Sequence, residues 1–176
     1  CNFYYEKGVK FGFLANEITL EEILEIKKRT NMKLMVECFG YPIMSHSRRM
    51  LLTNYFKSID KEKEDRVYHL ENMNEDYLLK ESKDGASILY GKLINGVKPL
   101  FDLVENNIDY AVLDMQEVEK EIGKKVLSTY SDIIKNHSSI TIKEKSSIID
   151  EMNDLIGDNT NFFYKKTIYK VKKGDK

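Results

Sequence analysis

A β-α-β unit near the start of the chain constrains the fold more than any other feature of the sequence. The mostly apolar stretch 9–14 predicts a strand, and Thr19 with Glu22 forms the S/T-x-x-E pattern that begins a helix. The helix is expected to end near Arg29. The apolar residues at 34–36 predict a second strand over residues 33–37. A crossover of about 18 residues is too long for a hairpin, so we expect the two strands to be parallel.

Further strands and helices alternate along the rest of the chain. We predict helices over residues 48–59, 99–105, 118–136 and 143–156, and strands over residues 66–70, 77–81, 86–90, 109–113 and 166–172. The Asp84-Gly85 pair predicts a hairpin between two of these strands. This alternation is typical of an α/β fold with a largely parallel sheet. The strands are too few for a closed (β/α)8 barrel, which needs about 250 residues. The expectation is a single domain over residues 1–176 that is either a partial TIM-barrel-like fold with one β-hairpin insertion or a small open α/β domain.

Composition narrows the classes of protein that remain. The 176 residues are 41% hydrophobic, and 28 basic residues nearly balance 29 acidic ones, so the overall charge indicates neither a nucleic-acid coat nor a membrane-surface protein. No apolar run reaches the roughly 20 residues of a membrane span, so we expect no membrane partner. Cys1 and Cys38 are not spaced as a disulfide framework, which indicates a reducing, cytoplasmic location. Because the chain starts without methionine, we expect the N-terminal strands of a longer protein to precede it. Unpaired sheet edges would then favour a homodimer.

Polar side chains follow the ends of the predicted strands. Asn16 and Glu17 follow the first strand, Glu37 ends the second, and Glu71 and Asp114 follow later ones. Active sites of barrels and open α/β sheets lie at the carboxyl ends of parallel strands. Glu37 is therefore a candidate catalytic group, with Asn16 and Glu17 as candidate substrate-binding residues. The alternative is that these charged residues only begin loops.

The densest group of reactive side chains lies just beyond Glu37. A turn at residues 40–42 is expected to fold the following loop back over the sheet edge, which would bring His46 and an arginine close to Glu37. The candidate site residues are then Glu37 and His46 as catalytic groups, with Ser45, Ser47, Arg48 and Arg49 in substrate binding. The alternatives are a salt bridge between Glu37 and an arginine, an exposed histidine, and serines that cap the next helix. Neither H-E-x-x-H nor C-x-x-C occurs, so we expect no metal site.

The segment at 37–56, ECFGYPIMSHSRRMLLTNYF, resembles the signature region of the collagenase-like peptidase family U32. ANEITLEEI at 15–23, the stretch 76–114 and NFFYKKTIYKVKKG at 161–174 also resemble parts of that family, so the resemblance covers nearly the whole chain. The resemblance implies a TIM-barrel-like domain and a peptidase of unknown catalytic type that acts on a peptide or protein substrate.

Some relatives in this family act instead in RNA or quinone hydroxylation, and several bind an iron–sulfur cluster through cysteines. In this chain Met50 stands before the Leu-Leu pair where a cysteine would be expected, and two cysteines cannot supply four thiolates. We therefore expect no iron–sulfur cluster and no other cofactor. The first alternative to the peptidase is an RNA-modifying or RNA-binding protein that uses Arg48, Arg49 and the lysine-rich C-terminal tail. The second alternative is a non-catalytic binding scaffold.

Overall fold

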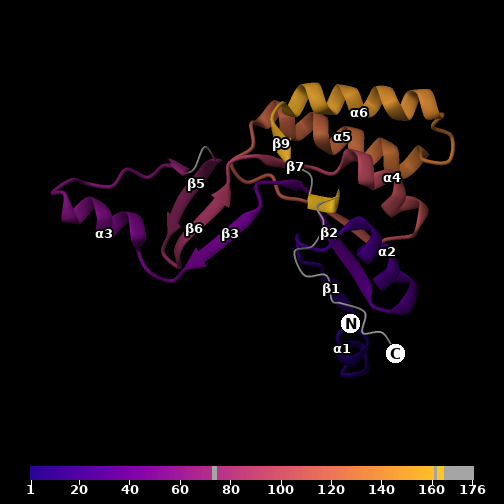
Figure 1. Ribbon diagram of the computed structural model, residues 1–176, viewed down its shortest axis with the longest axis horizontal. Coiled ribbons are helices and arrows are strands. Elements are labelled where there is room, and N and C mark those ends of the chain that lie inside the picture. The colour runs from indigo at the N-terminus through magenta and orange to yellow at the C-terminus, as the bar shows by residue number, and fades with distance from the viewer. Residues whose placement is uncertain (73–74, 161, 165–176) are drawn as a thin grey trace, which may run out of the picture. The chain divides into compact units, whose positions relative to one another are not determined.

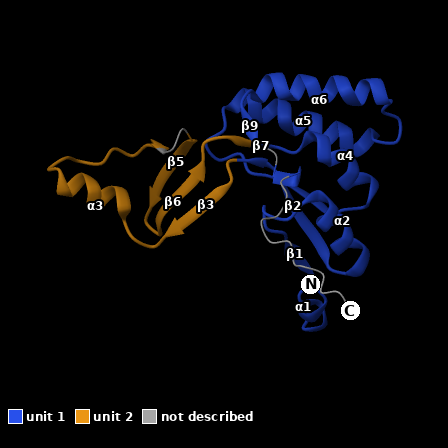
Figure 2. Cartoon of the chain, in the orientation of Figure 1, with its two compact units in different colours: residues 1–40, 94–176 blue, residues 41–93 orange. Residues whose placement is uncertain are grey.

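The structure is a computed structural model that describes residues 1–72, 75–160 and 162–164. It divides the chain into two compact units, shown in different colours in Figure 2. Unit 1 contains Cys1–Gly40 and Ile94–Lys176, and unit 2 contains Tyr41–Leu93. The fold is mixed α/β with both parallel and antiparallel strands, and the described residues form no closed barrel.

The sheet of unit 1 is built around a central strand, β2, at Lys33–Gly40 (Figure 1). Its strands are β1 Phe11–Phe13, β2, β7 Leu93–Asn95, β8 Tyr110–Leu113 and β9 Asn159–Thr160. Both β1 and β8 pair with β2 in parallel, and since both pair with Met35 they lie on opposite edges of β2. The parallel β-α-β unit is thereby confirmed. Strand β7 pairs in the antiparallel direction with the end of β2, which runs three residues further than predicted.

Helices supply most of the remaining structure of unit 1. They are α1 Asn2–Glu6, α2 Leu20–Arg29, α4 Val97–Glu105, α5 Lys120–Asn136, α6 Ile142–Ile156 and the short 3-10 helix Phe162–Tyr164. The capping box that predicted α2 is present, because the Thr19 hydroxyl accepts from the Glu22 N–H and the Glu22 carboxylate accepts from the Thr19 N–H. The helices predicted over residues 99–105, 118–136 and 143–156 are confirmed as α4, α5 and α6.

The core of unit 1 lies between β2 and these helices. Leu34, Val36 and Cys38 alternate along β2 and are buried on one face of the sheet. Helices α4, α5 and α6 lie side by side, as Figure 1 shows. Tyr130 of α5 is fully buried, and its hydroxyl donates to the Cys38 carbonyl over 3.0 Å, which fixes α5 against the middle of the sheet.

Unit 2 is an antiparallel sheet with one helix. Its elements are β3 Ile43–Ser47, α3 Leu51–Ser58, β4 Tyr68–Asn72, β5 Glu75–Ser82 and β6 Gly85–Tyr90, with the strands in the order β3-β6-β5-β4. The predicted hairpin is confirmed, since Ser82 pairs with Gly85 across a two-residue turn. The loop predicted at Ser45–Arg49 is wrong for its first three residues, because Ile43–Ser47 forms β3 and pairs with β6. An antiparallel edge strand with a solvated face tolerates polar residues, so its sequence resembled that of a loop.

The strand directions correct one expectation about the sheet. The sheet is not largely parallel, because β7 runs antiparallel to β2 and the strands of unit 2 are antiparallel. The strand predicted over residues 166–172 lies outside the described residues. Within the described ranges, every helix is too short or too polar to cross a membrane.

Candidate functional site

Glu37 lies on the central strand of the parallel sheet and has close polar neighbours from both flanking strands. The Asn16 side-chain amide, just beyond β1, donates to Glu37 Oε2 over 2.7 Å. Asp114 follows directly after β8, and its N–H donates to the Phe39 carbonyl over 2.7 Å. Asn16 and Asp114, which follow the two strands that flank β2, therefore lie close to Glu37. Glu37 is inside β2 and not at its end, because the strand continues to Gly40.

Gly40 allows the end of β2 to pass very close to this group. Its φ is 138°, a region that side-chain-bearing residues rarely adopt. A Cβ atom at this position would lie 2.7 Å from Asp114 Cβ, 2.9 Å from the Asp114 carbonyl oxygen and 3.3 Å from Glu37 Oε1. The close approach of Glu37 and Asp114 thus depends on a residue without a side chain at position 40.

The surroundings of Glu37 raise the pKa of its carboxyl group above the ordinary value. Burial is the largest cause, and the negative charge of Asp114 acts in the same direction, while the hydrogen bond from Asn16 opposes both. An arginine close to Glu37, as expected from the sequence, would have lowered the pKa of this carboxyl group. The observed direction is the opposite. A carboxyl group that keeps its proton to higher pH can donate as well as accept a hydrogen bond.

A small pocket lies beside Glu37 and Asn16. Its other lining residues are mostly apolar: Leu14, Ala15, Ile18, Ile23, Val36, Ile94, Phe162 and Phe163. The pocket has a volume of about 10 Å³, which is room for no more than a single water molecule. This pocket is therefore too small to hold a substrate beside Glu37.

The second predicted cluster belongs to unit 2. Ser45, His46 and Ser47 lie on β3, and His46 Nδ1 is 3.0 Å from the Ser87 hydroxyl on the neighbouring strand. Successive side chains of a strand point to opposite faces, so His46 is on the face opposite to Ser45 and Ser47. The Ser47 hydroxyl accepts from the Arg49 N–H over 3.1 Å, which orders the turn before α3. His46 therefore does not activate either serine as a nucleophile.

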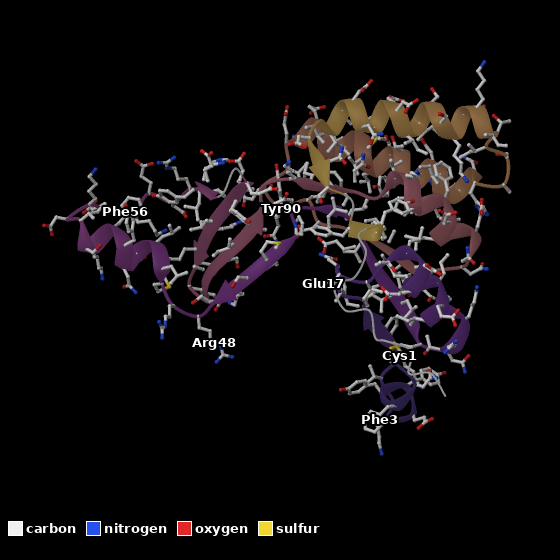
Figure 3. The ribbon with its side chains drawn as sticks, viewed as in Figure 1. Cys1, Phe3, Glu17, Arg48, Phe56 and Tyr90 are labelled. Atoms are coloured by element: carbon white, nitrogen blue, oxygen red, sulfur yellow. The ribbon has the colours of Figure 1, made fainter. Side chains whose placement is uncertain are left out.

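The structure brings only some of the predicted residues together. Asn16 and Glu37 form one group in unit 1, and Glu17 is exposed beside them. The Ser45–Arg49 group falls in unit 2, where Arg48 is exposed and extends away from the strands (Figure 3). The joint site of Glu37 with His46 and an arginine stays a prediction.

Sequence reasoning missed two residues near Glu37, Asp114 and Gly40, and misplaced Glu71, which belongs to unit 2. Asp114 was recognised as a strand-end residue but not as part of the site, although its position after a predicted parallel strand was the available signal. Glu71, grouped with it in the sequence, lies within β4 of the antiparallel sheet and not beyond a parallel strand. The sequence indicated Gly40 only as a turn residue and gave no sign of its close approach to Asp114.

The cysteines do not fit an iron–sulfur cluster. Cys38 is fully buried, and burial together with the charge of Glu37 raises the pKa of its thiol to about 12. Cys1 is the other cysteine of the chain, and four thiolates are needed. No group of three or more His, Cys, Asp or Glu side chains in the described ranges is arranged to hold a metal ion.

Comparison with known proteins places this mixed α/β chain in a family. Residues 1–172 match peptidase family U32, so the chain belongs to that family. It is 26% identical over 186 residues to the tRNA hydroxylation protein P2 of Bacillus subtilis (strain 168). That alignment covers 96% of this chain and 60% of the relative, so the chain spans less than two thirds of the relative's length. No solved structure matches the chain.

Proposed function

We propose that this protein takes part in the hydroxylation of tRNA and is not a peptidase. The observation that carries the proposal is the similarity to a relative named as a tRNA hydroxylation protein, which extends over 96% of the chain. The family name alone suggests peptide hydrolysis, but the relative's name favours the RNA-modifying alternative. A tRNA substrate also accords with the cytoplasmic location predicted from the sequence.

The group around Glu37 supports recognition of a nucleobase better than attack on a peptide. Base edges present hydrogen-bond donors and acceptors side by side. The Glu37 and Asp114 carboxyl groups place hydrogen-bond acceptors beside each other, which suits the donor groups of a base edge. A serine peptidase needs a serine next to a histidine base that a third group orients. His46 Nδ1 lies 3.0 Å from the Ser87 hydroxyl, but among the described residues the His46 ring makes no second hydrogen bond that would orient it as a base.

Hydroxylation of a base is an oxidation, and this chain's donor set does not fit an iron–sulfur cluster. We therefore assign to Asn16, Glu37 and Asp114 the binding and orientation of the base, with no redox step. The whole protein is proposed to contain a TIM-barrel-like domain of which β1, β2 and β8 are three parallel strands. The predicted homodimer through open sheet edges remains part of this proposal.

The experiment compares tRNA from cells with and without the gene. Total tRNA is digested to nucleosides, and hydroxylated nucleosides are measured by liquid chromatography and mass spectrometry. We expect a hydroxylated nucleoside to disappear on deletion and to return with the wild-type protein but not with Glu37→Gln. Glu62→Gln, at an exposed carboxylate of unit 2, is the matched control and should restore it. Unchanged nucleosides after deletion would contradict the proposal.

A further inference from the structure

Arg48 and Arg49 differ from the other arginines of the chain in their electrostatic partners. The chain has four arginines, and the other two, Arg29 and Arg66, each form a salt bridge with a nearby glutamate. Among the described residues, neither Arg48 nor Arg49 forms an ion pair. The planar guanidinium group suits phosphate and carboxylate groups, so two adjacent ones without an acidic partner are matched to an anionic ligand.

The sequence around these two arginines contains no acidic residue. Although 29 of the 176 residues are acidic, no Asp or Glu occurs between Glu37 and Asp60, which is the longest such stretch of the chain. The same stretch contains Arg48, Arg49 and Lys57. A single carboxylate would need only one guanidinium group, whereas a continuous cationic segment is suited to a polyanion such as the backbone of RNA.

The turn that carries the arginines packs closely against the hairpin between β5 and β6. Gly85 has a φ of 128°, and a Cβ atom at this position would clash with the Ser47 carbonyl oxygen and lie 2.8 Å from Arg48 Cα. The Arg49 N–H donates to the Ser47 hydroxyl over 3.1 Å. Asp84 of the hairpin turn precedes Gly85, yet within the described ranges it forms no ion pair with either arginine. The backbone at both arginines is therefore held by β3 and the hairpin.

Glu81 of β5 holds the helix that follows the arginines. Its carboxylate accepts from the Leu52 N–H over 2.9 Å and from the Thr53 N–H over 3.2 Å, and Leu52 is buried. The charge of Glu81 thus faces the donors at the start of α3 and not the guanidinium groups. A turn that is fixed at both ends presents its side chains to a ligand at a smaller cost in conformational entropy.

Unit 2 is an insertion in the sheet of unit 1, and its strands are separate from the barrel proposed for the whole protein. Gly40 and Ile94, where the chain leaves and re-enters unit 1, pair with each other in antiparallel strands. Strands β3 to β6 pair only among themselves in the described part of the chain. Strands that complete the barrel would pair with the edges of β1 and β8, so closing the barrel does not place Arg48 and Arg49 in its interior. The insertion follows the carboxyl end of β2, from which barrel folds build their binding loops.

We propose that Arg48 and Arg49 bind phosphate groups of the tRNA backbone, while the group around Glu37 binds the base. This inference rests on the proposed function and names the residues that hold the tRNA backbone. Phosphate contacts position a nucleic acid without reading its sequence. The two arginines therefore contribute to affinity and orientation and not to the choice of base.

The experiment measures the binding of a fluorescein-labelled tRNA transcript to the full-length protein by fluorescence anisotropy at several salt concentrations. Arg48→Gln with Arg49→Gln removes both charges, and Arg48→Lys with Arg49→Lys keeps the charges without the planar pair of donors. The matched control is Arg29→Gln with Arg66→Gln, which removes the two arginines that have glutamate partners. Polyglutamate is the competitor that tests for an acidic protein ligand.

We expect the glutamine double variant to reduce the magnitude of the slope of log K against log salt by roughly 1.4–1.8, since each phosphate contact contributes roughly 0.7–0.9. Binding should weaken at least about tenfold at about 0.1 M salt. The lysine double variant should keep the slope and bind with intermediate affinity. The control should keep the slope of the wild type. Circular dichroism melts establish that each variant is folded, and if the glutamine double variant does not fold, the single variants Arg48→Gln and Arg49→Gln decide the matter, each with about half the change in slope.

Three outcomes would overturn the inference. It is refuted if the wild type does not bind tRNA, or if the glutamine double variant binds tRNA with the slope and affinity of the wild type. If that variant lowers the urea midpoint of the full-length protein and leaves the salt slope unchanged, the arginines form ion pairs within the protein. If polyglutamate displaces tRNA from the wild type as well as unlabelled tRNA does, the arginines bind acidic chains in general and the assignment to RNA is wrong.

The proposed function is judged separately, by the nucleosides of the deletion strain. If a hydroxylated nucleoside disappears on deletion but the arginine variants bind tRNA normally, only the phosphate-binding residues are refuted. If the nucleosides do not change on deletion, the proposed function is refuted, whereas a reduced salt slope of the glutamine double variant would still establish the phosphate contacts.

Discussion

Glu81 of β5 holds the start of α3, and replacing it should destabilise unit 2 in a pH-dependent way. Its carboxylate accepts from the Leu52 N–H over 2.9 Å, from the Thr53 N–H over 3.2 Å and from the Thr53 hydroxyl, while the side chain is only 8% exposed. Hydrogen bonds to a charged group contribute roughly 1.5–3 kcal/mol net, so Glu81→Ala should cost about 3 kcal/mol. Glu81→Gln keeps one acceptor but loses the charge at a helix N-terminus, which should cost about 1 kcal/mol.

The pH dependence follows from the pKa of Glu81, which lies below its ordinary value. Burial acts to raise it, but the hydrogen bonds from Thr53 and Leu52 and the charge of Lys63 outweigh burial. Because the folded state favours the charged form, the stabilisation is complete above the unfolded pKa of about 4.3 and is lost as the pH falls through the folded value. The wild type and Glu81→Gln should therefore differ at pH 7 and converge at strongly acidic pH.

The assay is hydrogen exchange with mass spectrometry over α3, β5 and β6, combined with urea unfolding at pH 7 and at acidic pH. Glu62→Gln, in the exposed connection after α3, is the control and should change stability by less than about 0.5 kcal/mol. The reasoning is refuted if Glu81→Ala protects α3 as well as the wild type does, or if the deficit of Glu81→Gln persists unchanged at low pH.

Three further predictions concern unit 1. Glu37→Gln should be as stable as the wild type or more stable at pH 7, since it still accepts from Asn16 without a buried charge, yet tRNA hydroxylation should fall; a urea midpoint well below that of the wild type would contradict this. Gly40→Ala should cost roughly 2–3 kcal/mol by urea unfolding, whereas Gly8→Ala, also at positive φ but with no atom within 4 Å of its Cβ, should cost roughly 1 kcal/mol. Cys38 should resist thiol reagents at pH 8 until urea unfolds the chain, and anaerobically purified protein should carry less than stoichiometric iron with no charge-transfer absorbance.

Local signals in the sequence predicted much of the fold. The Thr19–Glu22 capping box and the apolar spacing of α5 depend on neighbouring residues only, so their elements were found within a few positions. The assignment of residues 45–47 to a loop failed because β3 is defined by its pairing with β6, some 40 positions further along. Such pairing is decided by the rest of the sheet and leaves little trace in a short polar stretch.

The site was predicted in part for a similar reason. Topology alone placed Asn16 beside Glu37, because residues that follow adjacent parallel strands meet at one edge. The environment of Glu37 could not be predicted, since its pKa depends on burial and on Asp114, which is 77 positions away in the sequence. The approach of Asp114 in turn needs the backbone conformation of Gly40, which no sequence pattern specified.

Two carboxylates of this chain, Glu37 and Glu81, show how structure separates a supporting side chain from a candidate functional one. Glu81 is surrounded by donors, its pKa is lowered, and the fold gains stability from its charge. Glu37 has one donor and a neighbouring carboxylate, its pKa is raised, and the fold loses stability when it ionises. A carboxyl group whose ionisation lowers stability, close to a glycine at positive φ and near the carboxyl end of a parallel strand, has the physical character of a binding or catalytic site. For this reason Glu37, more than the arginines and His46 of unit 2, is the residue on which the proposed function should first be tested.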